Sequence, residues 1–232
     1  MFDVFFISYH EQYADENFEA LKDKVPIAKR VDGIKGIFNA HKQAAKLSKT
    51  KMFYVVDADA VLVEDFEFDY QLTEFDKTYR NVLKTNCVHT WRALNPINDL
   101  VYGYGGVKLF PTKGLKNATK WNVDFTTSVV KHFIPMPEVS NITAFNTDPF
   151  NTWKSGFREC VKLSSSVIKN QHPDTEKRLD IWCTIGDDRL YGKDAIAGAI
   201  AGRKYGKQHE GDIDALSKIN DYDWLKEQYA IA

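Results

Sequence analysis

The sequence predicts an α/β fold that begins as a doubly wound, mostly parallel sheet flanked by helices. Over roughly the first sixty residues, apolar segments of strand length alternate with segments of helical periodicity, the pattern of consecutive β-α units. The third apolar segment, Met52–Val56, is hydrophobic at every position, as strands buried on both faces of a parallel sheet are. The expected strands are residues 2–9, 25–32 and 52–56, and the helices between them are residues 11–24 and 37–48.

The pattern changes after residue 80. Strands are expected at residues 81–94 and 100–111, and helices at residues 149–169, 175–185 and 193–205. The small residues of the last helix favour close packing against another helix over a phosphate-binding loop. No linker, repeat or low-complexity segment interrupts the chain. We therefore expect a single domain over residues 1–232, with a parallel half at 1–80 and a mixed half at 81–232.

Composition excludes several classes of protein. The 232 residues include 31 Lys or Arg and 32 Asp or Glu, and 44% are hydrophobic, which excludes a disordered chain. The apolar stretch Ala195–Gly202 is far shorter than the roughly 20 residues of a membrane helix, so no membrane partner is expected. The N-terminal residues have no basic region or cleavage site and are expected to form a strand rather than a signal peptide. Three widely spaced cysteines, Cys87, Cys160 and Cys183, argue against a disulfide framework and favour a cytoplasmic location.

Charge is unevenly distributed along the chain. Residues 108–207 carry 16 Lys or Arg against 10 Asp or Glu, a net charge of +6, with aromatic residues between the basic ones. Such a segment could face a polyanion, although a solvated loop-and-helix surface has the same composition. Composition therefore permits nucleic-acid binding without establishing it.

The strongest chemical signal is Asp57-Ala58-Asp59, which directly follows the buried third strand. In open α/β sheets, ligands bind beyond the carboxyl ends of the strands. Ionised carboxylates are hard oxygen ligands that suit Mg²⁺ or Mn²⁺, and such a cation can bridge to phosphate oxygens. Two unpaired acids this close would repel each other without a cation, although two acids on a surface loop remain the structural alternative.

This motif resembles that of GT-A glycosyltransferases, in which a strand ending in Asp-x-Asp holds a divalent cation against a nucleotide-sugar diphosphate. Segments 53–59, 102–108 and 194–202 are similar to glycosyltransferase-like proteins of T4-like tailed bacteriophages, a resemblance that spans most of the chain. Some of these relatives glycosylate 5-hydroxymethylcytosine in phage DNA, one group with arabinose. The resemblance implies a Rossmann-like GT-A fold, a UDP-linked sugar as donor, Mn²⁺ or Mg²⁺ as cofactor, duplex DNA as acceptor partner, and the cytoplasm of an infected bacterium.

Carried over residue by residue, the resemblance divides the chain into a nucleotide-sugar-binding half, 1–80, and an acceptor-side half, 81–232. Asp59 would ligate the metal, and Asp57 would bind the metal or the ribose. The remaining donor contacts it implies are Ser8 and Tyr9 at the base, Asp32 at the base or ribose, Lys35 and His41 at the phosphate or sugar, and Gly105 and Gly106 at the sugar. For Tyr9, Asp32, Lys35 and His41, a role in packing, a turn or solvation fits equally well.

GT-A enzymes often supply a further metal ligand, a histidine late in the chain. His209 is preferred for its position and His172 is the second candidate, while a solvated histidine is the structural alternative. A histidine ligand would favour Mn²⁺ over Mg²⁺.

The acceptor side is expected around the glycine-rich segment 102–106 and the strand before it. Tyrosines offer stacking planes for a sugar or base, and glycines allow a backbone or ligand to approach closely, although a kinked strand needs them too. The implied acceptor contacts are Trp91, Arg92, Tyr102 and Tyr104, with Asn95 and Asn98 nearby.

A transferase also needs a general base or a means of stabilising an oxocarbenium-like transition state. The candidate catalytic acids are Asp124 and Asp148, with Asp187-Asp188 as a third possibility. Asp148 precedes an expected helix, where it could equally serve as the N-cap. The stereochemical outcome, inverting or retaining, therefore stays open, as does oligomeric state.

Two other functions fit parts of the sequence. A phosphohydrolase with an aspartate nucleophile also places Asp-x-Asp after a buried strand. Its motif usually ends the first strand and continues with a hydroxyl residue, whereas here two β-α units precede the motif and Ala60-Val61 follow it. A non-catalytic nucleotide-sugar or nucleic-acid binding module that kept the fold is the third alternative.

Overall fold

The computed structural model describes residues 1–72, 77–103, 105–119, 123–130, 132–167 and 173–231. It divides into two compact units. The first comprises residues 1–95, 101–121 and 125–144 and contains the sheet, and the second comprises residues 96–100, 122–124 and 145–232 and is helical. The boundary near residue 144 differs from the division expected at residue 80, because later strands complete the sheet that the first three begin.

The first unit opens with the predicted strands and helices. They are β1 (Asp3–Ser8), α1 (Ala14–Lys24), β2 (Lys29–Asp32), α2 (Ile37–Leu47) and β3 (Met52–Asp57). The expected second strand is four residues shorter at its start, because a turn occupies residues 26–27. These five elements confirm the predicted α/β order.

The remaining strands extend the same sheet. They are β4 (Ala60–Leu62), β7 (Val88–Leu94), β8 (Val101–Gly103), β9 (Val107–Pro111) and β10 (Phe133–Thr143). Short elements complete the unit: β5 (Thr78–Tyr79), β6 (Val82–Leu83), the 3₁₀ turn η1 (Lys84–Asn86), α3 (Thr112–Asn117) and α4 (Phe125–Ser128). The expected strand at 81–94 is thus divided by η1, and the expected strand at 100–111 is divided by its glycines.

Among the described residues the main sheet has the order β2-β1-β3-β9-β7-β10-β4, with β8 beside β7. The pairs β1–β2, β1–β3 and β7–β10 are parallel, whereas β9 is antiparallel to both of its neighbours, and β4 and β8 are antiparallel to theirs. Five of these eight strands therefore run in one direction.

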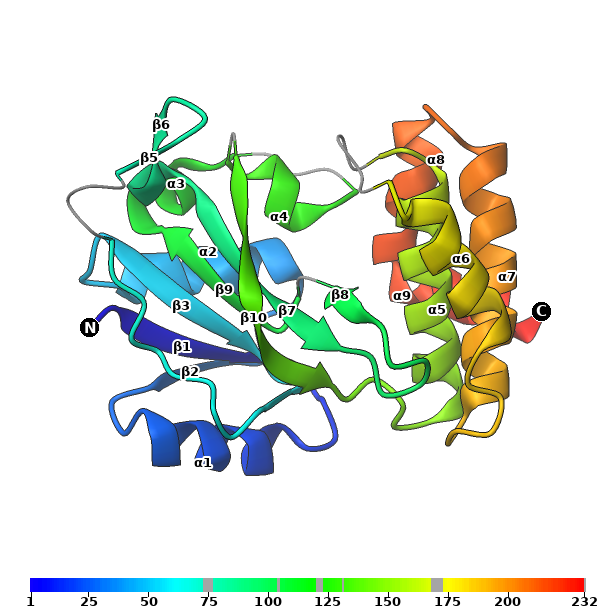
Figure 1. The fold of residues 1–232 in the computed structure, drawn as a ribbon, viewed down its shortest axis with the longest axis horizontal. Coiled ribbons are helices and arrows are strands. Elements are labelled where there is room, and N and C mark those ends of the chain that lie inside the picture. Colours follow the sequence, from blue (N-terminus) through cyan, green and yellow to red (C-terminus); the bar gives the residue numbers. More distant parts are fainter. Residues whose placement is uncertain (73–76, 104, 120–122, 131, 168–172, 232) are drawn as a thin grey trace. The chain divides into compact units, whose positions relative to one another are not determined.

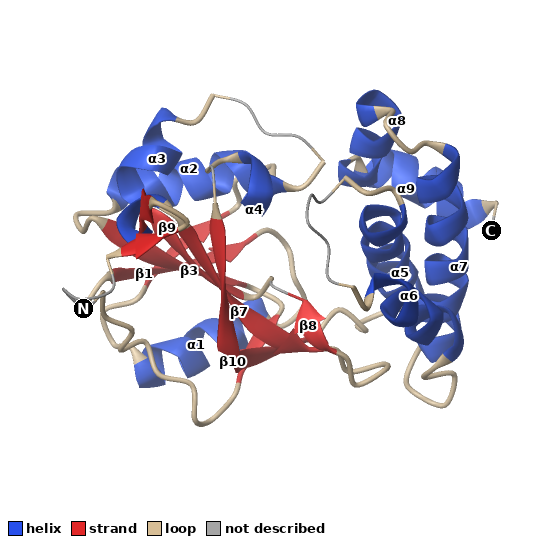
Figure 2. Ribbon diagram, turned by 45° about the horizontal axis from the view of Figure 1, so that its top comes forward, coloured by secondary structure: helices blue, strands red, loops and turns tan. Residues whose placement is uncertain are grey.

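The two helical crossovers lie on opposite faces of the sheet (Figures 1 and 2). Alternate strand residues point to opposite faces. Phe6 and Tyr54 pack with Leu21 of α1, and Phe5 and Phe53 pack on the other face with the alanines of α2. Connections that diverge to opposite faces beside β1 define a switch point of the sheet, where ligand crevices form.

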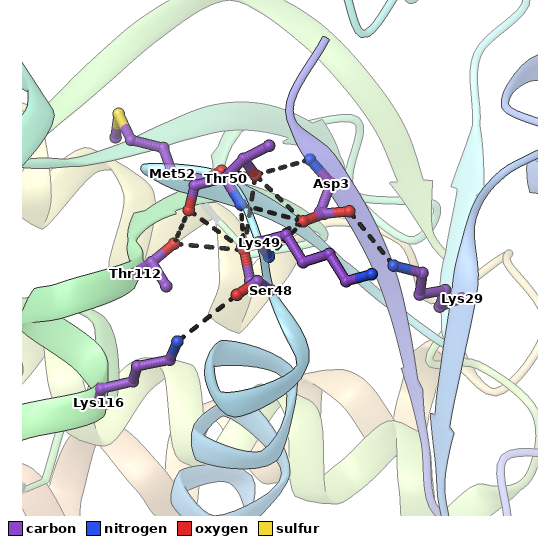
Figure 3. A network of polar contacts seen from close by, with 8 residues as sticks. All are labelled: Asp3, Lys29, Ser48, Lys49, Thr50, Met52, Thr112 and Lys116. Carbon is purple, nitrogen blue, oxygen red and sulfur yellow. Dashed lines mark hydrogen bonds and ion pairs between the residues drawn. The ribbon is translucent and has the colours of Figure 1, made fainter.

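Hydrogen bonds tie the amino ends of β1 and β3 together (Figure 3). The Asp3 carboxylate accepts hydrogen bonds from the backbone N–H groups of Lys49, at 2.7 Å, and Thr50, at 3.2 Å. Thr112 Oγ1 in turn donates to the Thr50 carbonyl at 2.7 Å. Burial acts to raise the pKa of Asp3, but these N–H groups and the Lys29 ammonium hold it below its usual value. The register of β1 and β3 is therefore fixed at one end, which aligns their opposite, carboxyl ends.

The helical unit comprises α5 (Pro149–Ser164), α6 (Thr175–Thr184), α7 (Gly192–Gln208), α8 (Ile213–Ser217), the 3₁₀ turn η2 (Lys218–Asn220) and α9 (Tyr222–Ala230). The three predicted helices are confirmed, although α5 ends five residues earlier than expected, before Ser166 at φ 57°. Across the described residues, no helix has the length and apolar character needed to cross a membrane.

Helices α5 and α7 pack backbone to backbone through glycines. A Cβ on Gly198 would lie 2.1 Å from the Trp153 carbonyl oxygen, and one on Gly202 would lie 2.2 Å from that of Phe157. From the other side, a Cβ on Gly156 would lie 2.3 Å from the Ala195 carbonyl oxygen. The small-residue segment is thus a helix-packing face, as expected.

We predict that Gly198→Ala destabilises the protein by about 1–3 kcal/mol, because the new methyl group overlaps a backbone carbonyl that cannot rotate away. Helix propensity alone would predict the opposite sign, a gain of up to about 1 kcal/mol. Urea denaturation of both proteins measures the difference. Ile200→Ala, at a position of the same helix that is 54% exposed, is the control and should change stability by less than about 0.5 kcal/mol.

Candidate functional site

Three neighbouring strand ends bring polar side chains together. Ser8 pairs in register with Asp32, and Ile7 pairs with Asp57, so the last residues of β1, β2 and β3 lie side by side at one edge of the sheet. This edge is the carboxyl end of the parallel strands, at the switch point beside β1. Parallel topology therefore concentrates the predicted donor-side residues where a ligand crevice is expected.

Asp32 is held by a hydrogen-bonded network. Ser8 Oγ donates to Asp32 Oδ1 at 2.5 Å and accepts from Arg30 Nε at 2.8 Å, while Arg30 Nη1 contacts Asp15 Oδ1 at 2.5 Å. The Ser8 hydrogen bond and then the Arg30 charge lower the pKa of Asp32 despite some burial. Because the Asp32 side chain is 58% exposed, it presents an oriented, ionised acceptor to solvent.

Ser8 itself is only 1% exposed. The Ser8 hydroxyl is enclosed between Arg30 and Asp32, whereas the expected contact was with a nucleotide base. Its place in the network gives it a different task, which is to orient the Asp32 carboxylate.

Asp57 ends β3 in an ion pair with a buried lysine. Lys108 Nζ lies 2.7 Å from Asp57 Oδ2, and the Lys108 side chain is 4% exposed. Lys108 pairs with Val55 in the antiparallel ladder, so its side chain projects on the same face as Asp57, two residues further along β3. The Asp57 N–H donates to the Gly106 carbonyl at 2.9 Å, which fixes the backbone as well. A charged group this deeply buried needs such a partner.

Asp59 lies in the turn between β3 and β4, where its carboxylate is half-buried. The turn is held on both sides: Asn17 Nδ2 of α1 donates to the Ala58 carbonyl at 2.8 Å, and the Ala144 N–H donates to the Asp59 carbonyl at 2.7 Å. Burial, followed by the negative charges of Asp57 and Glu11, raises the pKa of Asp59 to about 6, and Lys108 opposes this rise.

The donor set at this edge suits a divalent cation. The carboxylates of Asp57 and Glu11 act on Asp59, and together with burial, the larger cause, they raise its pKa against the opposing charge of Lys108. Among the described residues, no three His, Cys, Asp or Glu side chains are already grouped as a metal site. Asp57 and Asp59 would therefore supply two oxygen ligands and leave the others to water and phosphate, as Mg²⁺ sites commonly do.

Tyr9 and Lys35 lie on loops that follow the first two strands. Tyr9 is 39% exposed, and its N–H donates to Glu11 Oε2 at 2.5 Å, so its ring is accessible for stacking. Lys35 is exposed in the loop between β2 and α2. Both positions are compatible with the expected donor contacts.

His41 and Trp91, which were expected to contact ligands, are both buried. His41 is fully buried, with its ring 4.5 Å from that of Phe125 and its Nδ1 donating to the Ile37 carbonyl. Burial, and then the Lys108 charge, lower the pKa of His41 to about 3, so it is a neutral core residue. Trp91 is 3% exposed and packs against Tyr54 and Phe66. The rings of both residues therefore lie in the core, whereas contacts with ligands were expected.

A side chain would be sterically blocked at Gly106 but not at Gly105. A Cβ on Gly106 would lie 2.3 Å from Asn141 Oδ1, whereas one on Gly105 would meet no atom within 4 Å. Gly106 therefore permits the close approach of the Asn141 side chain. Of the expected acceptor contacts, Arg92 is exposed on β7, whereas Tyr104 and the side chain of Tyr102 lie outside the described residues.

The remaining candidates belong to the helical unit. Asp148 is the N-cap of α5 and accepts a hydrogen bond from the Asn151 N–H at 2.8 Å, as the capping alternative expected. Asp124 is half-buried, and its charge contributes to raising the pKa of Lys162, after that of Glu159. Asp187 and Asp188 are exposed in a turn. His209 follows α7 with its ring 4.3 Å from that of Tyr205, and His172 lies outside the described residues.

Sequence reasoning missed three charged residues of this edge: Glu11, Arg30 and Lys108. Lys108 carried a readable signal, because it is the one charged residue in Val107–Pro111, a strand otherwise apolar. Arg30 precedes Asp32 by two residues, so both side chains lie on the face of β2 opposite the buried Val31. Charged residues are common on such an exposed face, and Arg30 therefore gave no signal.

No family model and no curated protein matches the sequence. Seven chains of solved structures match the fold. HddC from Yersinia pseudotuberculosis is similar over 62% of this chain and 92% of its own, with a TM-score of 0.35 and 9% identity. The mannosyltransferase PcManGT from Pyrobaculum calidifontis, solved with GDP-Man and Mn²⁺, is similar over 99% of this chain and 79% of its own, with a TM-score of 0.44 and 12% identity.

We predict that Asp59→Asn stabilises the protein by about 1–3 kcal/mol at pH 7.5 and that this gain disappears as the pH falls to about 4. A carboxylate whose pKa is raised by folding destabilises the folded state above that pKa, near 6, and this penalty is removed by protonation. Urea denaturation at several pH values measures the difference. Asp23→Asn, on the exposed face of α1, is the control; a gain of equal size there would contradict the assignment.

Proposed function

We propose that the chain is a metal-dependent glycosyltransferase that moves a sugar from a nucleoside-diphosphate donor to an acceptor hydroxyl. The observation that carries the proposal is the pair Asp57 and Asp59 at the end of a buried parallel strand, beside the oriented carboxylate of Asp32. A nucleotide sugar needs both kinds of group, because its diphosphate requires a cation and its nucleoside offers hydrogen-bond donors.

In this proposal, residues at different strand ends bind different parts of the donor, the nucleoside and the diphosphate. The exposed Asp32 carboxylate accepts hydrogen bonds from the ribose hydroxyls or the base, and the Tyr9 ring stacks on the base. Ser8 and Arg30 keep Asp32 ionised and oriented. Lys35, on the adjoining loop, is placed to attract the diphosphate. A rigid set of partners reduces the entropy lost on binding.

Asp57 and Asp59 would hold Mn²⁺ or Mg²⁺ at this edge, with Lys108 keeping Asp57 in one orientation. When bound, the cation would neutralise negative charge on the departing nucleoside diphosphate. Asp59 is largely ionised at pH 7, because its pKa of about 6 lies below that value, and a cation would lower the pKa further.

The donor is proposed to be UDP-linked, and GDP-mannose is the natural competitor because the similar mannosyltransferase was solved with GDP-Man and Mn²⁺. The proposed acceptor is 5-hydroxymethylcytosine in duplex DNA, in keeping with the phage resemblance of segments 53–59 and 102–108. Its hydroxymethyl group projects into the major groove or is reached by flipping the base. The net charge of +6 over residues 108–207 supports attraction to phosphates.

The donor site is tested by thermal melts with UDP-, GDP- and CDP-sugars, each with and without Mn²⁺. Ligand at about 100 times its Kd stabilises the folded state by about 2.7 kcal/mol, which raises Tm measurably. We expect a Mn²⁺-dependent rise for one nucleotide class in the wild type. The same ligand should give no rise in Asp59→Asn, judged against that variant's own ligand-free Tm.

Other results of these assays would favour one of the alternative functions or contradict the proposal. Binding of the donor without turnover toward any hydroxyl acceptor would indicate a binding module. Release of inorganic phosphate from phosphate esters, without sugar transfer, would indicate the aspartate phosphohydrolase. No rise in Tm with any nucleotide sugar would contradict the transferase.

The acceptor is tested with a duplex oligonucleotide containing 5-hydroxymethylcytosine and the donor that gives the largest rise in Tm. We expect sugar transfer to this duplex and not to its unmodified counterpart, with a rate at limiting DNA that falls at least tenfold between about 50 and 200 mM salt. Donor hydrolysis without transfer to DNA would remove the DNA acceptor and leave the donor site in place.

The same assay examines the catalytic acids assigned from the sequence. Asp148→Asn keeps a side chain that caps helices well, so α5 should remain intact. A large fall in kcat with unchanged Tm would then identify Asp148 as a catalytic residue, and an unchanged kcat would leave it as a cap. Asp124→Asn is the companion variant.

A further inference from the structure

Two cysteines meet inside the helical unit, far along the chain from the proposed donor site. Cys160 of α5 is fully buried and Cys183 of α6 is half-buried, and the two thiols lie close enough that each shifts the pKa of the other. The contact joins two helices through groups that can form a covalent bond. All cysteines of the structure are present as thiols.

Cys183 also reaches solvent through a cationic cavity. The cavity has a volume of about 330 Å³ and is lined by Cys183 and by four residues of α7: Ile200, Arg203, Lys204 and Lys207. Three of these five side chains are cationic. A small, uncharged oxidant or an anionic reagent can therefore approach the Cys183 sulfur, whereas Cys160 is fully buried.

Arg203 is fixed against the thiol. Its guanidinium donates to Asp180 Oδ1 and Glu176 Oε2, each at 2.7 Å, and its interaction with Cys183 lowers the pKa of that thiol. The carboxylates of α6 thus hold the cation in place rather than leaving it to rotate into solvent. A fixed positive charge beside a partly exposed sulfur is the environment of reactive cysteines.

The pKa values of the two thiols are shifted in opposite directions. The hydrogen bond from Cys160, then those from Arg203, lower the pKa of Cys183 to about 6, against the opposing effects of burial and Asp180. Burial raises the pKa of Cys160 well above its usual value, and Glu159 on its own helix acts in the same direction. Near neutral pH the pair therefore consists of a thiolate that faces solvent and a thiol behind it.

We propose that Cys183 is a peroxide-reactive cysteine and that Cys160 resolves its oxidised form into a disulfide between α5 and α6. The Cys183 thiolate sulfur attacks one peroxide oxygen, so that an S–O bond forms, the O–O bond breaks and hydroxide leaves as water after taking a proton. The resulting sulfenic acid is then attacked by the Cys160 sulfur, which loses its proton. The S–S bond forms as the S–O bond breaks, and a second water leaves.

One hydroperoxide thus oxidises two thiols by two electrons, and no other reactant is needed. A dithiol reductant reverses the step. The disulfide would close a loop over residues 160–183 and bind α6 to α5 covalently, which stiffens the helical unit.

The test treats the full-length protein with a small excess of hydrogen peroxide and maps its peptides without reduction. We expect a Cys160–Cys183 disulfide, with Cys87 still a thiol because it is fully buried elsewhere. In Cys160→Ser the expected product is a Cys183 sulfenic acid that dimedone captures. Cys87→Ser is the matched control and should behave as the wild type does.

A second measurement addresses the activation of Cys183 directly. Alkylation by iodoacetamide at pH 7 should be at least about tenfold faster at Cys183 than at a free cysteine in a peptide, because the peptide thiol is only a few per cent ionised. Arg203→Gln should lose part of this advantage, because Cys160 is the larger cause of the lowered pKa, and circular dichroism checks that the helices remain. Three outcomes would overturn the proposal: alkylation at the peptide rate, oxidation of Cys183 to sulfinic acid without a disulfide, or disulfides only between different molecules.

Discussion

The buried ion pair between Lys108 and Asp57 is the interaction on which the arrangement of the strand ends depends. An ammonium group that is 4% exposed must be paired, and its partner is Asp57, the last residue of β3. The pair ties β9 to the carboxyl end of β3 and leaves Asp57 with one orientation. It also offsets part of the negative charge of Glu11, Asp57 and Asp59. Without an internal cation, three carboxylates at one edge would oppose folding more strongly.

At the end of β2, the Asp32 carboxylate is also held by a cationic partner, but it stays mostly exposed and so loses less hydration than Asp57. Arg30 and the buried Ser8 hydroxyl hold Asp32 ionised, while most of the Asp32 side chain stays in solvent. Asp32 therefore keeps its hydration and still has one orientation. The two carboxylates therefore differ in their pKa. The hydrogen bond from Ser8 and the charge of Arg30 lower the pKa of Asp32, whereas burial and two neighbouring carboxylates raise that of Asp59.

Much of the fold could be predicted because its first sixty or so residues obey local rules. Strand and helix periodicities were clear in β1 to β3, and the acids after β3 follow from where a buried run stops. The later strands could not be predicted as well. β10 contains Pro135 and Pro137, which removed the strand signal, and its pairing with β7 is interrupted between Pro135 and Val139. That Asp32, Asp57 and Asp59 lie at or beside strand ends could be predicted from the sequence. The burial of Ser8, His41 and Trp91 could not, because only tertiary packing decides whether a polar or aromatic side chain faces solvent or the core.

The glycine contacts between α5 and α7 have a consequence for how the helical unit can change. Where backbones touch, the two helices are close enough for Cα–H···O contacts to carbonyl oxygens, and no side chain stands between them to change rotamer. Sliding one helix past the other would bring the Trp153 or Phe157 carbonyl against a neighbouring residue that has a Cβ. The pair therefore has one register, and its geometry is encoded by the side chains that are missing. Any movement of helices within this unit is therefore expected in those that pack around α5 and α7, among them α6.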